Sequence, residues 1–297
     1  MSSPTSSLTD RRAARWMIAP AILVLATVAL YPVVAGVWLS LHRAILVFHE
    51  NRFIGLENYA FMARDPRFWS ALRNTAYFSV VAVAVELVLG MCFALLLDVR
   101  AHASHTAARS LLRASILVPW AIPTVVSAKL WAWLFNQDYG LLTRAVPGAS
   151  INWLGSPGYA MHAAIVVDVW KTTPFVTFLL LAGLVTIPRE VYEASEIDGA
   201  SRLHTFLRVT LPMLKPTLAV TLIFRTLDAF RVFDAVYVLT EGGPANTTET
   251  LSIYAYKTLM RTGDFGYGSA LSFATFACVM ALSMLYLRLL GDGARGP

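Results

Sequence analysis

Six apolar stretches dominate this sequence, and each is about as long as a helix that crosses a lipid bilayer. They cover residues 16–41, 75–97, 111–135, 160–187, 214–239 and 269–290. A membrane helix needs ~20 predominantly apolar residues. Hydrocarbon offers the backbone no hydrogen-bond partner except itself, so such stretches must be helical. The sequence therefore predicts an all-α polytopic membrane protein with six transmembrane helices.

The composition agrees with this class. Charged residues make up 14% of the chain and hydrophobic residues 57%, whereas a soluble domain carries about 25% charged residues. The net charge of +6 is spread over the loops, which argues against a nucleic-acid partner. The two cysteines, Cys92 and Cys278, lie inside apolar stretches. They are interpreted as small core residues that form neither a disulfide nor a metal site.

The distribution of basic residues predicts the orientation. Six spans place both ends of the chain on one side. With that side cytoplasmic, twelve lysines and arginines fall on cytoplasmic segments or at the cytoplasmic ends of spans, and eight fall on outer segments. Cytoplasmic loops are enriched in basic residues. We therefore expect cytoplasmic tails at 1–15 and 291–297, an outer loop at 42–74, and a location in the plasma or inner membrane.

A polar stretch at 188–216 separates the fourth span from the fifth on the cytoplasmic side. Pro188 suits the first position of a helix, because its missing N–H would be unpaired there. Gly199 can adopt the left-handed conformation that ends such a helix. A second short helix with one apolar face is expected to end at Leu211-Pro212. The stretch predicts two short helices outside the bilayer.

The spacing within this stretch resembles the EAA loop of binding-protein-dependent ABC importer permeases. That pattern is E-A-A, three residues, G, nine residues, and I-x-L-P, and it matches Glu193, Ala194, Ser195, Gly199, Val209, Leu211 and Pro212. Ser195 replaces the last alanine and Val209 the isoleucine. The resemblance implies a coupling helix that docks on an ATPase subunit, with Asp198 on the same surface. An ordinary amphipathic loop is the alternative interpretation.

Two outer segments extend the resemblance to carbohydrate-type permeases. Residues 54–75 contain Gly55-Leu56, Asn58-Tyr59 and Asn74-Thr75, and residues 242–251 contain Gly-Gly-Pro followed by Thr-Thr-Glu-Thr-Leu. From pattern alone, the first is an interfacial helix and the second a turn. The resemblance covers most of residues 54–290. It implies a type I ABC importer permease fold with a five-helix core at 75–290.

Ionisable residues at membrane depth are functional hypotheses by default. The fifth span carries four such residues at a spacing of three: Arg225, Asp228, Arg231 and Asp234. The fourth span carries a second group, Asp168 and Lys171 with the aromatic Trp170 between them. They either line a hydrated path that binds sugar hydroxyls or form a structural ion-pair ladder. The row in the fifth span winds by about 180°, so its members cannot all face one groove.

Four ionisable residues of the spans, two of them named above, are interpreted as pairs or as snorkelling side chains. Asp168 and Lys171 have the spacing of an i, i+3 pair. Glu86 and Lys129 are isolated in the second and third spans. We interpret these two as a mutual pair or as interfacial snorkels rather than as ligands.

The segments VWKTTPF and FRTLDAFRVFD, in the fourth and fifth spans, look like those of permeases for disaccharides such as trehalose or maltose. The resemblance implies four partners. These are a second homologous permease, an ABC ATPase dimer, an extracytoplasmic sugar-binding protein and membrane lipid.

No pattern of an enzyme active site occurs in the sequence. The chain lacks both the G-x-x-x-x-G-K-[ST] loop that holds ATP phosphates and the G-x-S-x-G motif of serine hydrolases. We therefore expect no catalytic, cofactor-binding or metal residue in this chain, and we expect ATP to be bound by the partner ATPase.

Two alternative functions remain. An ion-gradient transporter is opposed by the absence of a visible internal repeat. A glycerol phosphate permease could use Arg225 and Arg231, whose charges Asp228 and Asp234 compensate.

Overall fold

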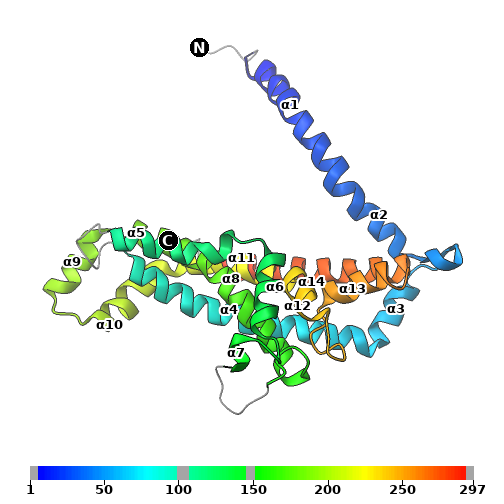
Figure 1. Cartoon of the computed structure of the whole chain (residues 1–297). Coiled ribbons are helices and arrows are strands. Elements are labelled where there is room, and N and C mark those ends of the chain that lie inside the picture. The colour runs from blue at the N-terminus through cyan, green and yellow to red at the C-terminus, as the bar shows by residue number, and fades with distance from the viewer. Residues whose placement is uncertain (1–5, 99–106, 145–150, 292–297) are drawn as a thin grey trace. The chain divides into compact units, whose positions relative to one another are not determined.

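The computed structural model of the protein describes residues 6–98, 107–144 and 151–291, and most of them are helical (Figure 1). Among these residues five helices are long and apolar enough to cross a membrane, and a bent pair of helices adds a sixth candidate. These findings confirm the all-α, polytopic class. Of the expected tails at 1–15 and 291–297, residues 1–5 and 292–297 lie outside the described residues, as does the basic loop around Arg100.

The chain divides into two compact units. The first comprises residues up to Asp65 together with Ala255–Ala274. It begins with α1 (Ser6–Leu25), the π-helical segment η1 (Ala26–Leu30) and α2 (Tyr31–Ser40). The linking residues keep helical backbone angles. The first span is therefore one helix, which starts within the expected polar tail.

The segment expected to form the outer loop at 42–74 is folded, not irregular. It contains β1 (His42–Ile45), the 3-10 turn η2 (Leu46–Phe48), β2 (Glu50–Phe53) and α3 (Glu57–Arg64). The strands pair antiparallel, with His42 opposite Phe53. A Cβ on Gly266 would lie 2.1 Å from the His42 carbonyl oxygen, so glycine permits the close approach of these two backbones.

The second unit comprises Pro66–Tyr254 and the chain from Thr275. Its helices are α4 (Pro66–Leu97), α5 (Ala107–Ala121), α6 (Thr124–Leu134), α7 (Leu141–Arg144), α8 (Pro157–Thr186), α9 (Arg189–Ile197), α10 (Arg202–Thr205), α11 (Leu211–Phe230) and α12 (Asp234–Thr240). Two later helices, α13 (Leu251–Met260) and α14 (Phe265–Gly291), contribute residues to both units.

Helices α4, α8 and α11 pack against one another and form the centre of the second unit (Figure 1). Small residues allow close contact. A Cβ on Gly90 of α4 would lie 2.5 Å from a methyl carbon of Val176 on α8, and one on Gly183 of α8 would lie 2.7 Å from the Cβ of Thr217 on α11. Such small residues let membrane helices approach closely.

Two spans differ from the sequence-based expectation near their outer ends or centres. Helix α4 begins at Pro66, whereas the apolar stretch begins at residue 75, so its first turns lie in the expected outer loop. The third span is not one helix: α5 and α6 meet at an angle of 96°. Pro123 has an extended backbone at this bend, which agrees with the inability of proline to continue a helical hydrogen-bond ladder.

The fifth span also differs from the expectation, at both of its ends. The prediction that Leu211-Pro212 ends the second loop helix is wrong, because α10 continues through the π-helical segment η4 (Phe206–Thr210) into α11. Pro212 falls in the first turn after the π segment, where the wider turn accommodates its missing N–H. The helix instead breaks at residues 231–233, between α11 and α12.

Candidate functional site

The loop between α8 and α11 is built from two helical arms joined at a glycine. Pro188 is the extended residue that precedes α9, so the first arm begins at Arg189 and not at the proline. The arm ends with hydrogen bonds from Asp198 N to Ala194 O and from Gly199 N to Glu196 O, each 3.0 Å long. Gly199 has a φ of +70°, which confirms the expected left-handed ending.

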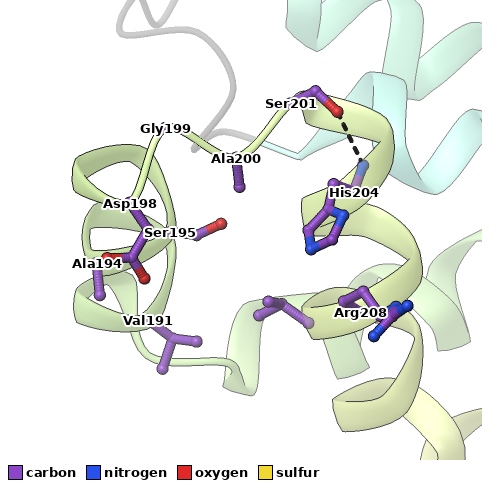
Figure 2. A pocket seen from close by; sticks show the side chains of 10 residues that line it. Val191, Ala194, Ser195, Asp198, Gly199, Ala200, Ser201, His204 and Arg208 are labelled. Carbon is purple, nitrogen blue, oxygen red and sulfur yellow. Dashed lines mark hydrogen bonds between the residues drawn. The ribbon is translucent and has the colours of Figure 1, made fainter.

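Side-chain hydrogen bonds hold the two arms together. The hydroxyls of Ser195 and Thr205 lie 2.8 Å apart, and the Thr210 hydroxyl donates to the Tyr192 oxygen at 3.3 Å. Figure 2 shows Ser195 directed toward the second arm, which begins where Ser201 accepts a hydrogen bond from His204 N. Ser195 thus uses its hydroxyl at the position where the family pattern has alanine.

A groove of about 540 Å³ lies between the arms (Figure 2). Five of the residues expected to couple to an ATPase line the groove: Ala194, Ser195, Asp198, Gly199 and Val209. Glu193, Leu211 and Pro212 lie outside its lining. Among all eight, Ser195 is buried, Val209 and Leu211 are half-buried, and the other five are exposed. Large apolar side chains are also exposed, with Ile197 at 87% and Leu203 at 67%. An apolar surface of this kind on a polar loop is suited to binding another protein.

The second feature is a buried ion cluster centred on Arg225 of α11. Its guanidinium binds Glu86 of α4 through two N–H···O bonds of 2.6 and 2.8 Å. It also reaches Asp168 of α8 at 3.2 Å and Asp228 at 2.6 Å. The side chain of Arg225 is 2% exposed and that of Glu86 is fully buried. Arg225 therefore joins three helices.

The interpretation of Glu86 as a partner of Lys129 or as an interfacial snorkel is wrong, because Glu86 is fully buried and its carboxylate binds Arg225. It stands 139 residues from Arg225, and no local spacing indicates the contact. The Thr172 hydroxyl lies 2.5 Å from the same carboxylate. One general rule could have suggested the contact: a charge at membrane depth must be paired. Arg225 therefore needed acidic partners, and Glu86 is an acidic residue of another span.

The exposed end of the cluster consists of Asp228 and Arg231. The two carboxylate oxygens of Asp228 contact different arginines. One accepts a hydrogen bond from Arg225 at 2.6 Å, and the other lies 3.6 Å from Arg231 Nη2. These two side chains are 56% and 69% exposed in the isolated chain. Asp234, also exposed, begins α12. The four residues of the row thus do not share one helix, because Arg231 lies in the break.

Trp170 and Lys171 contact the bent third span instead of this cluster. Lys171 Nζ donates to the carbonyl oxygen of Ile122 at 2.6 Å, at the bend between α5 and α6. The ring of Trp170 packs edge-on against Trp131 of α6 at 5.6 Å. The structure therefore gives Asp168 a different partner, Arg225, from the one that the i, i+3 spacing suggested.

The comparisons with known proteins decide the family. The model of the family described as "Binding-protein-dependent transport system inner membrane component" matches residues 87–292. That range includes both arms of the loop and the whole ion cluster except Glu86. The chain belongs to this family. It is therefore a multi-pass component of a membrane transport system, with permeases rather than enzymes as its relatives.

Two relatives and one solved structure define its place in the family. The chain is 45% identical to the trehalose/maltose transport system permease protein MalF of Thermococcus litoralis, over 92% of this chain and 91% of that protein. It is 38% identical to the trehalose transport system permease protein SugA of Mycobacterium tuberculosis, over 98% and 92%. A bacterial alginate ABC transporter crystallised with its alginate-bound periplasmic protein shares the fold. The TM-score is 0.83, with 18% identity and 98% of each chain covered.

Proposed function

We propose that this permease is the transmembrane subunit of an ABC importer that carries a disaccharide such as trehalose or maltose into the cytoplasm. The observation that carries the proposal is the two-armed loop between α8 and α11, with its groove and exposed apolar residues. The sugar class is supported by the trehalose and maltose permeases to which the chain is 45% and 38% identical.

The proposed partners follow from the loop and the family. An ABC ATPase dimer binds and hydrolyses ATP and receives the loop, with Glu193, Ala194, Asp198 and Ile197 on the docking surface. The loop and both termini then lie in the cytoplasm. A second homologous permease completes the pathway, and an extracytoplasmic sugar-binding protein delivers the substrate.

The chain connects the loop directly to the ion cluster. Helix α8 ends at Thr186, just before the first arm, and the second arm continues into α11. These two helices carry Asp168 and Arg225, which bind each other. A displacement of the loop by the ATPase is therefore transmitted to the two helices that this ion pair holds together.

The break at residues 231–233 is the proposed place of substrate contact. Irregular backbone at membrane depth is tolerated where it is buried in protein or lines a cavity, and transporters bind substrates at such breaks. Asp228, Arg231 and Asp234 offer exposed polar groups there, and the rings of Phe233 and Tyr237 stack at 5.0 Å. Arg225 and Asp168 hold this region, and Trp170 and Lys171 support the neighbouring bend.

A phosphate-bearing substrate is not favoured by this arrangement. A guanidinium has five N–H groups, and Arg225 makes four N–H···O contacts, all to carboxylate oxygens. The exposed Arg231 already faces Asp228. The cluster therefore lacks an uncompensated positive charge for a phosphate.

Substitution of Asp228 tests the sugar-binding role. In the reconstituted importer, we expect Asp228→Asn to lower kcat/KM for the sugar by about tenfold or more, because hydrogen bonds to charged groups contribute about 1.5–3 kcal/mol. Asp138→Asn, at an exposed turn, is the matched control and should transport as wild type. Unchanged transport kinetics in the Asp228 variant would contradict the assignment.

A further inference from the structure

The outer loop that joins α12 to α13 is folded tightly on itself. Thr248 donates its hydroxyl to Gly243 O at 2.8 Å, and its oxygen lies 2.7 Å from the Thr240 hydroxyl. Glu241, Gly242, Ala245 and Asn246 all have positive φ angles. The last three residues before α13, Thr248, Glu249 and Thr250, are at most 1% exposed. Polar residues this buried are held by specific partners.

One side of this loop is clamped to the first turns of α4. Arg67 donates two N–H···O bonds to Glu249, of 2.7 and 2.9 Å. Asn74 donates to the backbone carbonyls of Asn246 and Glu249, at 3.2 and 3.1 Å. Thr75 accepts from Leu251 N at 2.9 Å. The two outer motifs found in the sequence, around residues 74 and 249, are thus the two halves of one contact.

The other side of the loop reaches the break in the fifth span. The hydroxyl of Thr250 donates to the carbonyl oxygen of Val232 at 3.1 Å. Val232 lies between the end of α11 at Phe230 and the start of α12 at Asp234. Threonine side chains are among the groups that satisfy carbonyls at broken membrane helices. The loop therefore supplies a donor to the irregular backbone.

We propose that Thr250 is a positioning residue that sets which sugar this permease accepts, an inference that rests on the proposed function. The Val232 carbonyl belongs to the peptide that joins Val232 to Phe233, so holding it restrains the backbone of the break immediately after Arg231. The Arg67–Glu249 pair holds Thr250 in place from the other side. The outer loop thereby orients Arg231 toward Asp228, and with them the hydrogen bonds available to sugar hydroxyls.

Three variants test the proposal in the reconstituted importer with one wild-type binding protein. Thr250→Val removes the hydroxyl and keeps the shape, Thr250→Ser restores the hydroxyl, and Thr247→Val is the control. The Thr247 hydroxyl bonds to Pro244 O within the same loop and not to the break. The readout is the ratio of kcat/KM for trehalose to that for maltose, which does not depend on the amount of folded protein.

We expect Thr250→Val to change this ratio by about threefold or more, in keeping with one hydrogen bond at the site. Thr250→Ser and Thr247→Val should retain the wild-type ratio. Equal losses for both sugars in Thr250→Val, or an unchanged ratio, would overturn the positioning role even where Asp228→Asn still impairs transport. A wild-type importer that carries neither sugar would instead overturn the proposed function itself.

Discussion

Arg225 is the residue on which three helices of the second unit depend. It is 2% exposed and holds Glu86, Asp168 and Asp228. Removing one partner of a buried ion pair costs about 3–5 kcal/mol, because the remaining charge is left uncompensated. At this scale a buried arginine that holds helices differs from an exposed one, Arg231, which is the proposed substrate contact.

Substitution of the two arginines by methionine tests this separation. We expect Arg225→Met to lower the melting temperature and the membrane yield, since two buried carboxylates lose their cation. Arg231→Met should keep wild-type stability and reduce sugar transport, because its side chain is 69% exposed. Thermal unfolding of the purified proteins and transport assays distinguish them. A stable Arg225→Met protein that fails only in transport would make Arg225 a substrate ligand instead.

The residue-level site could be predicted only in part from the sequence. Charge at membrane depth correctly singled out Arg225, Asp228 and Asp168 as residues that need an explanation. The i, i+3 spacing predicted the Arg225–Asp228 pair, but the contacts between helices could not be predicted, because Glu86 is 139 residues away from Arg225 and a six-helix order does not specify which faces meet. The spacing of three also assumed a continuous helix through Arg231, which the break removes.

At the scale of elements, the two-armed loop is the part whose local structure was predicted best from the sequence. The proline before α9 and the left-handed Gly199 follow from intrinsic backbone preferences. The continuation of the second arm into α11 could not be predicted from the sequence. Pro212 was expected to end the arm, but a π-helical segment precedes it and the helix continues through it. The break between α11 and α12 could not be predicted either, because the hydrogen bond from Thr250 to the Val232 carbonyl comes from another loop.

Two substitutions in this loop test coupling separately from folding. Gly199→Pro removes the N–H that bonds to Glu196 O and forbids the φ of +70°, and Glu193→Lys reverses an exposed charge. Both should reduce transport to background while the amount of inserted protein stays at the wild-type level. Gly158→Ala, a helical glycine with open space around it, is the control. Normal transport by either loop variant would contradict the coupling assignment.

At the scale of the whole molecule, the hydropathy pattern was sufficient for the all-α polytopic class, because a bilayer imposes helix length and little else. Within the described residues five helices are long enough to span, and the bent pair of α5 and α6 is the sixth candidate. The spans carry extensive apolar surface in the isolated chain: none of the residues in the tested window of Trp16–Ser40 is buried. We expect lipid or the second permease to cover this surface. The complex, rather than the single chain, is the proposed transporting unit.

Affinity purification of a tagged copy from its native membrane in a mild detergent tests this central claim most directly, with mass spectrometry of the proteins that accompany it. The account predicts a P-loop ATPase and a second six-span permease in the purified complex. It also predicts that Glu193→Lys loses the ATPase and keeps the second permease. Recovery of the wild-type chain alone, folded and still able to transport sugar, would contradict the importer assignment and indicate a transporter driven by an ion gradient.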